Sequence, residues 1–220
     1  MNVFSPIKES IKGIRHTKGY VGIVFLIFSL LAMLASFMLS IEALFEARNP
    51  GSRFSCDINA VLSCSTVAAS DQAEILGKIL PFFGDFTVPN AFLGMIFEAV
   101  FITIAVLLIC GTKMPKWFMT ASQIGNLCAL IFAYWLFYQS SFVIGAMCPW
   151  CLLLMVSTTF QFFSQLHYNV LAQYLPFSEK FNNKLQSLIA SGVELMIEII
   201  VILIIVLIVV LKYGPRLIQG

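Results

Sequence analysis

Two pairs of cysteines have spacings that suit redox chemistry. Cys148 and Cys151 form the motif Cys-Pro-Trp-Cys before an apolar segment, and Cys56 and Cys64 are separated by seven residues. Pairs of this kind can exchange disulfides, form structural disulfides or contribute to zinc sites. Which chemistry applies depends on the helices that carry the cysteines and on the side of the membrane that they face.

Cys148 is expected at the N-cap of a helix. Pro149 follows it, and proline is favoured at the first helical position, where a backbone N–H has no partner within the helix. The positive end of the helix dipole favours the thiolate, which is the nucleophilic form. Cys151 lies one turn deeper on about the same face. The outer sulfur would then meet aqueous partners, while the inner sulfur faces the membrane interior.

The composition is that of an all-α integral membrane protein. Of the 220 residues, 60% are hydrophobic and only 11% are charged, and the formal net charge is just +2. A soluble domain could not bury so much apolar surface, and long apolar segments favour membrane helices. A charge of this size gives no indication of a nucleic-acid partner.

Five apolar segments approach the roughly 20 residues that a membrane helix needs. We expect spans over residues 20–41, 88–109, 118–137, 148–163 and 195–211, within a single membrane domain covering 1–220. The first segment is too long for a signal peptide, and no A-x-A-like cleavage site follows it. We therefore interpret it as a retained helix.

Basic residues in the short loops predict a cytoplasmic N-terminus in a cell membrane. They are Lys8, Lys12, Arg15 and Lys18 before the first span, Lys113 and Lys116 after the second, and Lys180 and Lys184 after the fourth. The loop 48–87 mixes acidic and basic residues and is expected outside. Lys212 and Arg216 disagree with this orientation, but late charges weigh less. Both cysteine pairs would then face the oxidising, periplasmic side.

A redox role is favoured over the alternatives for the two pairs. Seven residues between Cys56 and Cys64 are a loose spacing for zinc, and an oxidising compartment disfavours thiolate ligands. A purely structural disulfide in the external loop remains the other possibility. Cys110 and Cys128 are isolated in apolar segments and are interpreted as small packing residues.

A membrane quinone is the favoured electron acceptor, by elimination, because the sequence has no haem motif, Rossmann glycines or P-loop. Asn90, at the start of the second span, could bind a quinone carbonyl, although a polar residue easing the helix into the interface is the simpler reading. Glu98 in the same span is a functional candidate. A protonated carboxyl group, or one paired with Gln123 or Asn126, is an equal alternative for Glu98.

Three motifs together resemble the vitamin K epoxide reductase family, particularly its bacterial members. They are CDINAVLSCS in the loop, PNAFLG opening the second span and CPWC opening the fourth, in the family's order over about residues 20–163. The resemblance implies a four-helix bundle around a quinone site, with a fifth, peripheral transmembrane helix. It also implies roles for individual residues.

By this resemblance, Cys148 and Cys151 are the active-site pair, with Cys151 nearest the quinone. Cys64 would exchange with Cys148, and Cys56 would receive electrons from a thioredoxin-fold protein. Asn90 matches the family's quinone-binding asparagine, and Ser70 matches a serine that follows the loop cysteines. Met155 stands where animal members have a tyrosine, and it has no hydroxyl to donate.

The expected function is that of a quinone-linked oxidoreductase that generates disulfides. It would oxidise a thioredoxin-fold (DsbA-like) protein and pass the electrons to menaquinone or ubiquinone, without a metal. Many bacterial members carry a fused thioredoxin-like domain; this sequence ends at Gly220, so the thiol donor is expected to be a separate protein. The alternatives are a reductase of vitamin K quinone or its epoxide, against which Met155 argues, and a non-enzymatic membrane protein with structural loop disulfides.

Overall fold

The computed structural model describes residues 17–49, 51, 54–57, 62–75 and 88–218. Of residues 216–218 only the backbone is described. The predicted external loop 48–87 is therefore described in part. Cys56 and Cys64 are both among its described residues.

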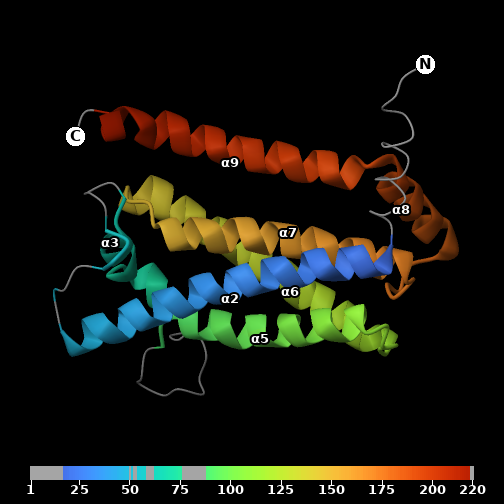
Figure 1. Ribbon diagram of the computed structural model, residues 1–220. Coiled ribbons are helices and arrows are strands. Elements are labelled where there is room, and N and C mark those ends of the chain that lie inside the picture. Colours follow the sequence, from blue (N-terminus) through green and yellow to red (C-terminus); the bar gives the residue numbers. More distant parts are fainter. Residues whose placement is uncertain (1–16, 50, 52–53, 58–61, 76–87, 219–220) are drawn as a thin grey trace, which may run out of the picture.

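The described residues form an antiparallel bundle of long helices (Figure 1). These helices are α2 (Lys18–Arg48), α5 (Asn90–Ile109), α6 (Lys116–Tyr138) with the π-helical turn η3 (Gln139–Ile144), α7 (Pro149–Leu171) and α9 (Val193–Ile218). Within the described residues, four segments are long and apolar enough to cross a membrane, namely Lys18–Arg48, Asn90–Ile109, Lys116–Ile144 and Val193–Pro215. The prediction of an all-α membrane protein is confirmed.

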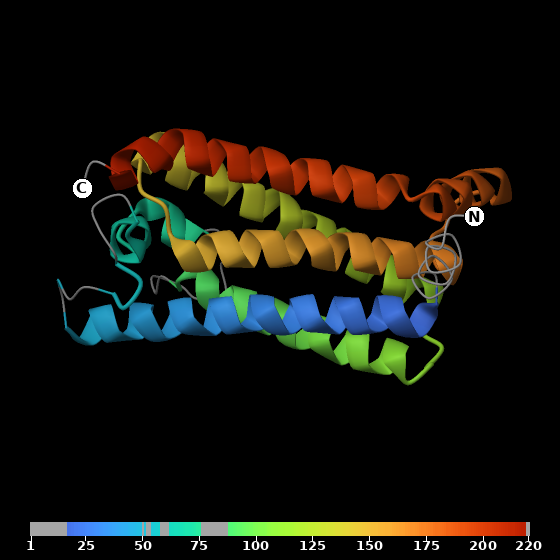
Figure 2. The ribbon, with the colours of Figure 1, turned by 45° about the horizontal axis from the view of Figure 1, so that its top comes forward.

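The segment expected to span the membrane at 148–163 begins the longer helix α7. This helix is not among the four apolar segments, because its second half carries Gln161, Gln165, His167 and Asn169. These side chains are buried, and α7 packs against α2, α6 and α9 (Figure 2). Its 23 residues give a length of about 34 Å, enough to cross a hydrocarbon core of about 30 Å. A membrane helix can carry these polar side chains because they face neighbouring helices and not lipid.

Hydrogen bonds between amide and carboxyl side chains join α7 to α5 and α6. Gln161 Nε2 donates to Glu98 Oε2 at 3.0 Å, Asn126 Nδ2 to Gln165 Oε1 at 2.7 Å, and Asn169 Nδ2 to Gln123 Oε1 at 2.8 Å. Glu98 therefore pairs with Gln161, and not with Gln123 or Asn126, which the sequence offered as alternative partners. Those two side chains bond to α7 instead, and so does Glu98.

Helices α2 and α5 approach each other closely at small residues. A Cβ atom on Gly94 would lie 2.8 Å from Ser36 Oγ, and one on Gly22 would lie 3.0 Å from Ile109 Cγ1. Close packing of this kind holds helices together where lipid removes the hydrophobic driving force. Phe25 and Phe101 extend the same interface with an edge-to-face contact, in which the ring centroids lie 6.2 Å apart.

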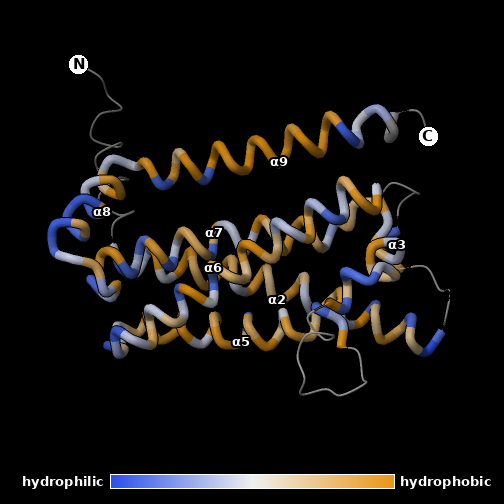
Figure 3. Tube along the Cα trace, turned by 180° about the vertical axis from the view of Figure 1, so that it is seen from behind, coloured by the Kyte–Doolittle hydropathy of each residue, from blue (hydrophilic) through white to orange (hydrophobic). Residues whose placement is uncertain are grey.

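Helix α9 lies along the outside of the other long helices (Figures 1 and 2). It contacts α7 and the short amphipathic helix α8 (Glu179–Ser191). Figure 3 shows that α9 is apolar over most of its length, whereas α8 is largely hydrophilic. The antiparallel order places the ends of α2, η3 and α9 at one end of the bundle, together with the starts of α5 and α7. We call this the loop end.

Candidate active site

Four cysteines meet at the loop end of the bundle. Cys56 and Cys64 form a disulfide, and Cys148 and Cys151 are free thiols. Cys148 Sγ lies 3.1 Å from Cys64 Sγ, and each of these two cysteines is only 1% exposed. A separation near 3 to 3.5 Å between reacting atoms suits direct attack. The thiol of Cys148 therefore stands at exchange distance from one sulfur of the loop disulfide.

The start of α7 holds Cys148 in place. Cys148 is the N-cap and Pro149 the first helical residue, as predicted, and the Cys151 N–H donates to Cys148 Sγ at 3.3 Å. The chain reaches this point from η3 through Gly145, whose φ of 78° is one that L side chains rarely adopt. Glycine thus allows the turn that delivers Cys148 to the top of α7.

A backbone contact brings the loop to the same point. The Ser63 N–H donates to the Met147 carbonyl at 3.0 Å, which pairs the residues immediately before Cys64 and Cys148. Ser63 also caps the short helix α3 (Cys64–Ala68) by accepting from the Thr66 N–H. The close approach of Cys64 and Cys148 therefore follows from main-chain pairing as well as from side-chain packing.

Asp57 ties together the two sides of the loop disulfide. Its Oδ2 accepts from the Phe54 N–H at 3.0 Å and from Ser65 Oγ at 2.6 Å. Its Oδ1 accepts from the Ser65 N–H and from Ser63 Oγ, both at 3.0 Å. Burial alone raises the pKa of Asp57, but these hydrogen bonds outweigh it and lower the pKa from 3.8 to about 2. The carboxylate is the form that orders the loop.

We expect Asp57→Asn to loosen the loop and to lower Tm by about 2–4 °C at pH 7. The pKa of Asp57 is lower in the folded chain than in the unfolded chain, so its stabilisation is complete above about pH 4 and is lost as the pH falls toward 2. Thermal unfolding of both proteins between pH 3 and 7 measures this. The difference in Tm should be constant from pH 7 to 5 and should shrink below pH 4. A difference that stays constant down to pH 3 would contradict the assignment.

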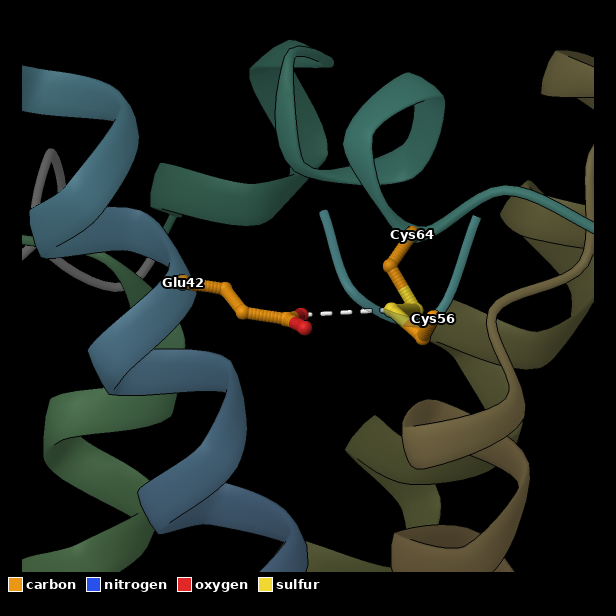
Figure 4. Close-up of side chains that lie close together, drawn as sticks. All are labelled: Glu42, Cys56 and Cys64. Carbon is orange, nitrogen blue, oxygen red and sulfur yellow. Dashed lines mark hydrogen bonds between the residues drawn. A yellow bond between two sulfur atoms is a disulfide. The ribbon is translucent and has the colours of Figure 1, made fainter. Parts of the chain in front are cut away.

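Glu42 is a site residue that the sequence reasoning missed. It lies near the end of α2, is 6% exposed, and directs its carboxylate at the loop disulfide (Figure 4). Its Oε1 accepts from Ser55 Oγ at 2.5 Å, and its Oε2 lies 3.2 Å from Cys56 Sγ. The available signal was an acidic residue directly after the predicted span 20–41, although nothing in the sequence links it to Cys56.

Glu42 and the two loop sulfurs are close enough together to suggest a metal site. One ligand atom from each residue lies within 4.8 Å of the others. Cysteine binds metals as the thiolate, however, and both sulfurs are joined in the disulfide. In this state the three residues are not a set of metal ligands, and the contact between Glu42 and Cys56 needs another explanation.

The other predicted site residues lie outside the buried cluster of cysteines, which is built on Phe54, Cys64 and Cys148. Asn90 Nδ2 donates to the Gln72 carbonyl at 2.7 Å and so holds η1 (Asp71–Glu74) over the start of α5. Ser70 Oγ donates to the Val67 carbonyl at 2.6 Å. Met155 is 1% exposed and follows Cys151 by one helical turn. Cys110 and Cys128 are exposed.

Comparison with known proteins gives one family. The model of the Vitamin K epoxide reductase family matches residues 23–166. No curated protein matches the chain in a sequence search. The matched region begins within α2 and ends within α7, so it contains all four cysteines of the cluster and Glu42.

Proposed function

The chain belongs to the vitamin K epoxide reductase family, and from this premise we propose that it is a quinone-linked enzyme that makes disulfides in other proteins. Membership makes it a membrane thiol oxidoreductase with a working cysteine pair. The finer proposal concerns the route of the electrons. They would pass from a thioredoxin-fold (DsbA-like) protein to Cys56–Cys64, then to Cys148–Cys151, and finally to a quinone.

The observation that carries the proposal is the distance of 3.1 Å between Cys64 Sγ and Cys148 Sγ. When the loop pair is reduced, the Cys64 thiolate attacks Cys148 Sγ of a Cys148–Cys151 disulfide, and Cys151 leaves as a thiolate. Cys56 then attacks Cys64 Sγ, so the loop disulfide re-forms and Cys148 is released as a thiolate. Two electrons have moved inward, from one pair to the other.

The redox state of the structure corresponds to one stage of this cycle. The loop pair is a disulfide, whereas Cys148 and Cys151 are thiols. This is the state after the inward transfer and before Cys148 and Cys151 give two electrons and two protons to the acceptor. A thiol beside a disulfide is the arrangement that thiol–disulfide exchange requires.

Exposure supports Cys56 as the residue that meets the thiol donor. Cys56 is half-buried, whereas Cys64 and Cys148 are each 1% exposed. A folded protein can therefore reach Cys56 more readily than either of the other two. Its thiolate would attack Cys56 Sγ, and Cys64 would leave as a thiolate with the electron pair of the broken S–S bond.

A lipid-soluble quinone suits the acceptor because Cys151 lies one turn further into the bundle than Cys148. Menaquinone and ubiquinone are the two candidate acceptors of this class. We propose that Asn90 binds a quinone oxygen, that Ser70 orders the segment above it, and that Met155 contributes an apolar wall. The missing hydroxyl at Met155 favours a quinone over an epoxide as the substrate.

The charges support a loop end that faces the outside of a cell membrane. Lys18, Lys113 and Lys116 flank α2, α5 and α6 at the opposite end of the bundle, and α8 carries Lys180 and Lys184 there. Basic residues mark the cytoplasmic side. The cysteines would then lie in the compartment in which disulfides persist.

Quinone reduction by the purified full-length chain tests the proposal. We expect a reduced thioredoxin-fold protein to drive reduction of a short-chain ubiquinone or of menadione, followed by absorbance without oxygen. The rate should exceed the protein-free reaction by at least about 100-fold. A chain whose cysteines have been alkylated is the control. Equal rates with native and alkylated chain would overturn the proposal in favour of a structural role for the disulfides.

A further inference from the structure

The contact between Glu42 and Cys56 cannot be a hydrogen bond in the disulfide form unless the carboxyl group carries the proton. Oε2 of Glu42 lies 3.2 Å from Cys56 Sγ, and that sulfur is bonded to Cys64. A disulfide sulfur has no proton to donate, and an ionised carboxylate facing it gains no hydrogen bond. The contact becomes a hydrogen bond when Cys56 is a thiol, or when Glu42 is protonated. The first of these states arises when the disulfide is reduced.

The surroundings of Glu42 fix this orientation. Ser55 Oγ donates to Oε1 at 2.5 Å, which leaves Oε2 directed at the sulfur (Figure 4). Glu42 is 6% exposed, although it lies near the end of a helix where a long side chain could reach water. Burying a carboxyl group is unfavourable unless its oxygens have partners. Among the described residues, Cys56 Sγ is the atom that lies within hydrogen-bonding distance of Oε2.

We propose that Glu42 is a catalytic residue that holds and transfers a proton at Cys56 Sγ, a role that rests on the proposed function. The thiolate of the donor protein attacks Cys56 Sγ, the Cys56–Cys64 bond breaks, and Cys64 leaves with the electron pair. The donor's second thiol then gives its proton to Glu42 and attacks its own first sulfur. Cys56 leaves as a thiolate and takes the proton from Glu42. The donor ends as a disulfide, and Cys56 as a thiol.

Glu42 also favours the reduced loop pair at equilibrium. The bond from the Cys56 thiol to an ionised carboxylate forms only after reduction, and hydrogen bonds to charged groups are about twice as strong as neutral ones. Stabilising the dithiol makes the disulfide a stronger oxidant of the donor protein. The same residue would thus speed the exchange and direct it toward electron uptake.

The test isolates the loop pair in the full-length chain with Cys148→Ser, so that electrons stop at Cys56 and Cys64. Dithiothreitol opens the disulfide, and labelling with a maleimide polymer counts the two new thiols on a gel. In this background, Glu42→Gln should slow opening at pH 7 by at least about tenfold. It should also shift the equilibrium with glutathione toward the disulfide by about fivefold.

Three further variants make the outcome specific. Glu42→Asp keeps the carboxylate and should restore part of the rate, whereas Ser55→Ala should give a smaller loss because it frees the carboxylate to turn. Glu46→Gln, one turn further along α2 and half-buried, should leave the rate unchanged. Equal rates and equilibria for Glu42→Gln and its parent would overturn the inference, and so would an equal loss in Glu46→Gln.

The same samples separate the role of Glu42 from misfolding of the variant and from failure of the proposed function. If Glu42→Gln fails to fold, the slower opening of a folded Glu42→Asp relative to its parent still supports the role, and an unchanged rate overturns it. No quinone is present in this assay. A wild-type chain that fails to reduce quinone would therefore sink the proposed function, while the effect of Glu42 on the loop disulfide would stand or fall separately.

Discussion

Replacing Cys151 by alanine is expected to reduce quinone reduction to the rate seen without protein, a loss of at least about 100-fold. Cys151 is the inner thiol of the pair, and Cys148 cannot form its disulfide without it. The variant should still open and close its Cys56–Cys64 disulfide, because that pair lies on the other side of Cys148. Loss of one reaction with retention of the other distinguishes a catalytic thiol from a residue needed for folding.

The measurement follows quinone absorbance in the absence of oxygen, with a reduced thioredoxin-fold protein as donor. Cys128→Ala is the matched control, since Cys128 is a free cysteine exposed on α6. We expect it to retain the wild-type rate. Full activity in Cys151→Ala would remove Cys151 from the reaction, and a comparable loss in Cys128→Ala would indicate damage to the bundle.

Local features of the sequence predicted the start of α7 well. Pro149 has no N–H to lose and follows a residue that can accept a capping hydrogen bond, so Cys148 was expected at the N-cap and is found there. The class of the fold was equally accessible, because long apolar segments leave few alternatives to membrane helices. Both inferences use neighbours in the sequence only.

Contacts between distant segments were out of reach of the same reasoning. Gln123 and Asn126 were possible partners of Glu98 by sequence, but in the bundle both amides bond to side chains of α7, and Glu98 bonds to Gln161. Apolar helices give little indication of which face meets which neighbour, because lipid and protein interior attract the same side chains. The sequence can therefore predict that a polar group inside the bundle is paired, but it does not predict which residue is its partner.

Glu42 illustrates the same limit at the candidate site. Thirteen residues lie between it and Cys56 in the sequence. Only the folded loop, held by Asp57 and by the Ser63–Met147 backbone bond, carries the sulfur to the carboxylate. The approach of Cys64 to Cys148 was likewise implied by the family resemblance rather than by spacing.

The identity of the cysteine that meets the donor protein can be decided by trapping. In Cys64→Ala, Cys56 is an unpaired thiol. The donor is a thioredoxin-fold protein that keeps one active-site cysteine, and that cysteine is activated as a mixed disulfide with nitrothiobenzoate. When this donor is mixed with the Cys64→Ala chain, Cys56 should displace the nitrothiobenzoate and stay bound to the donor. In the reduced wild-type chain, Cys64 attacks Cys56 Sγ and releases the donor. We expect at least about tenfold more conjugate in the variant.

Peptide mapping of the conjugate identifies the sulfur that holds the donor. Cys56 is half-buried whereas Cys148 is 1% exposed, so the donor should be found on Cys56, and Cys56→Ala should give almost none. The buried sulfurs of Cys64 and Cys148 would then exchange only with other cysteines of this chain. Electrons would therefore follow a single path from the surface to the bilayer. A donor trapped on Cys148 would reverse this order, because electrons would then bypass the loop pair and Glu42 would have no part in their uptake.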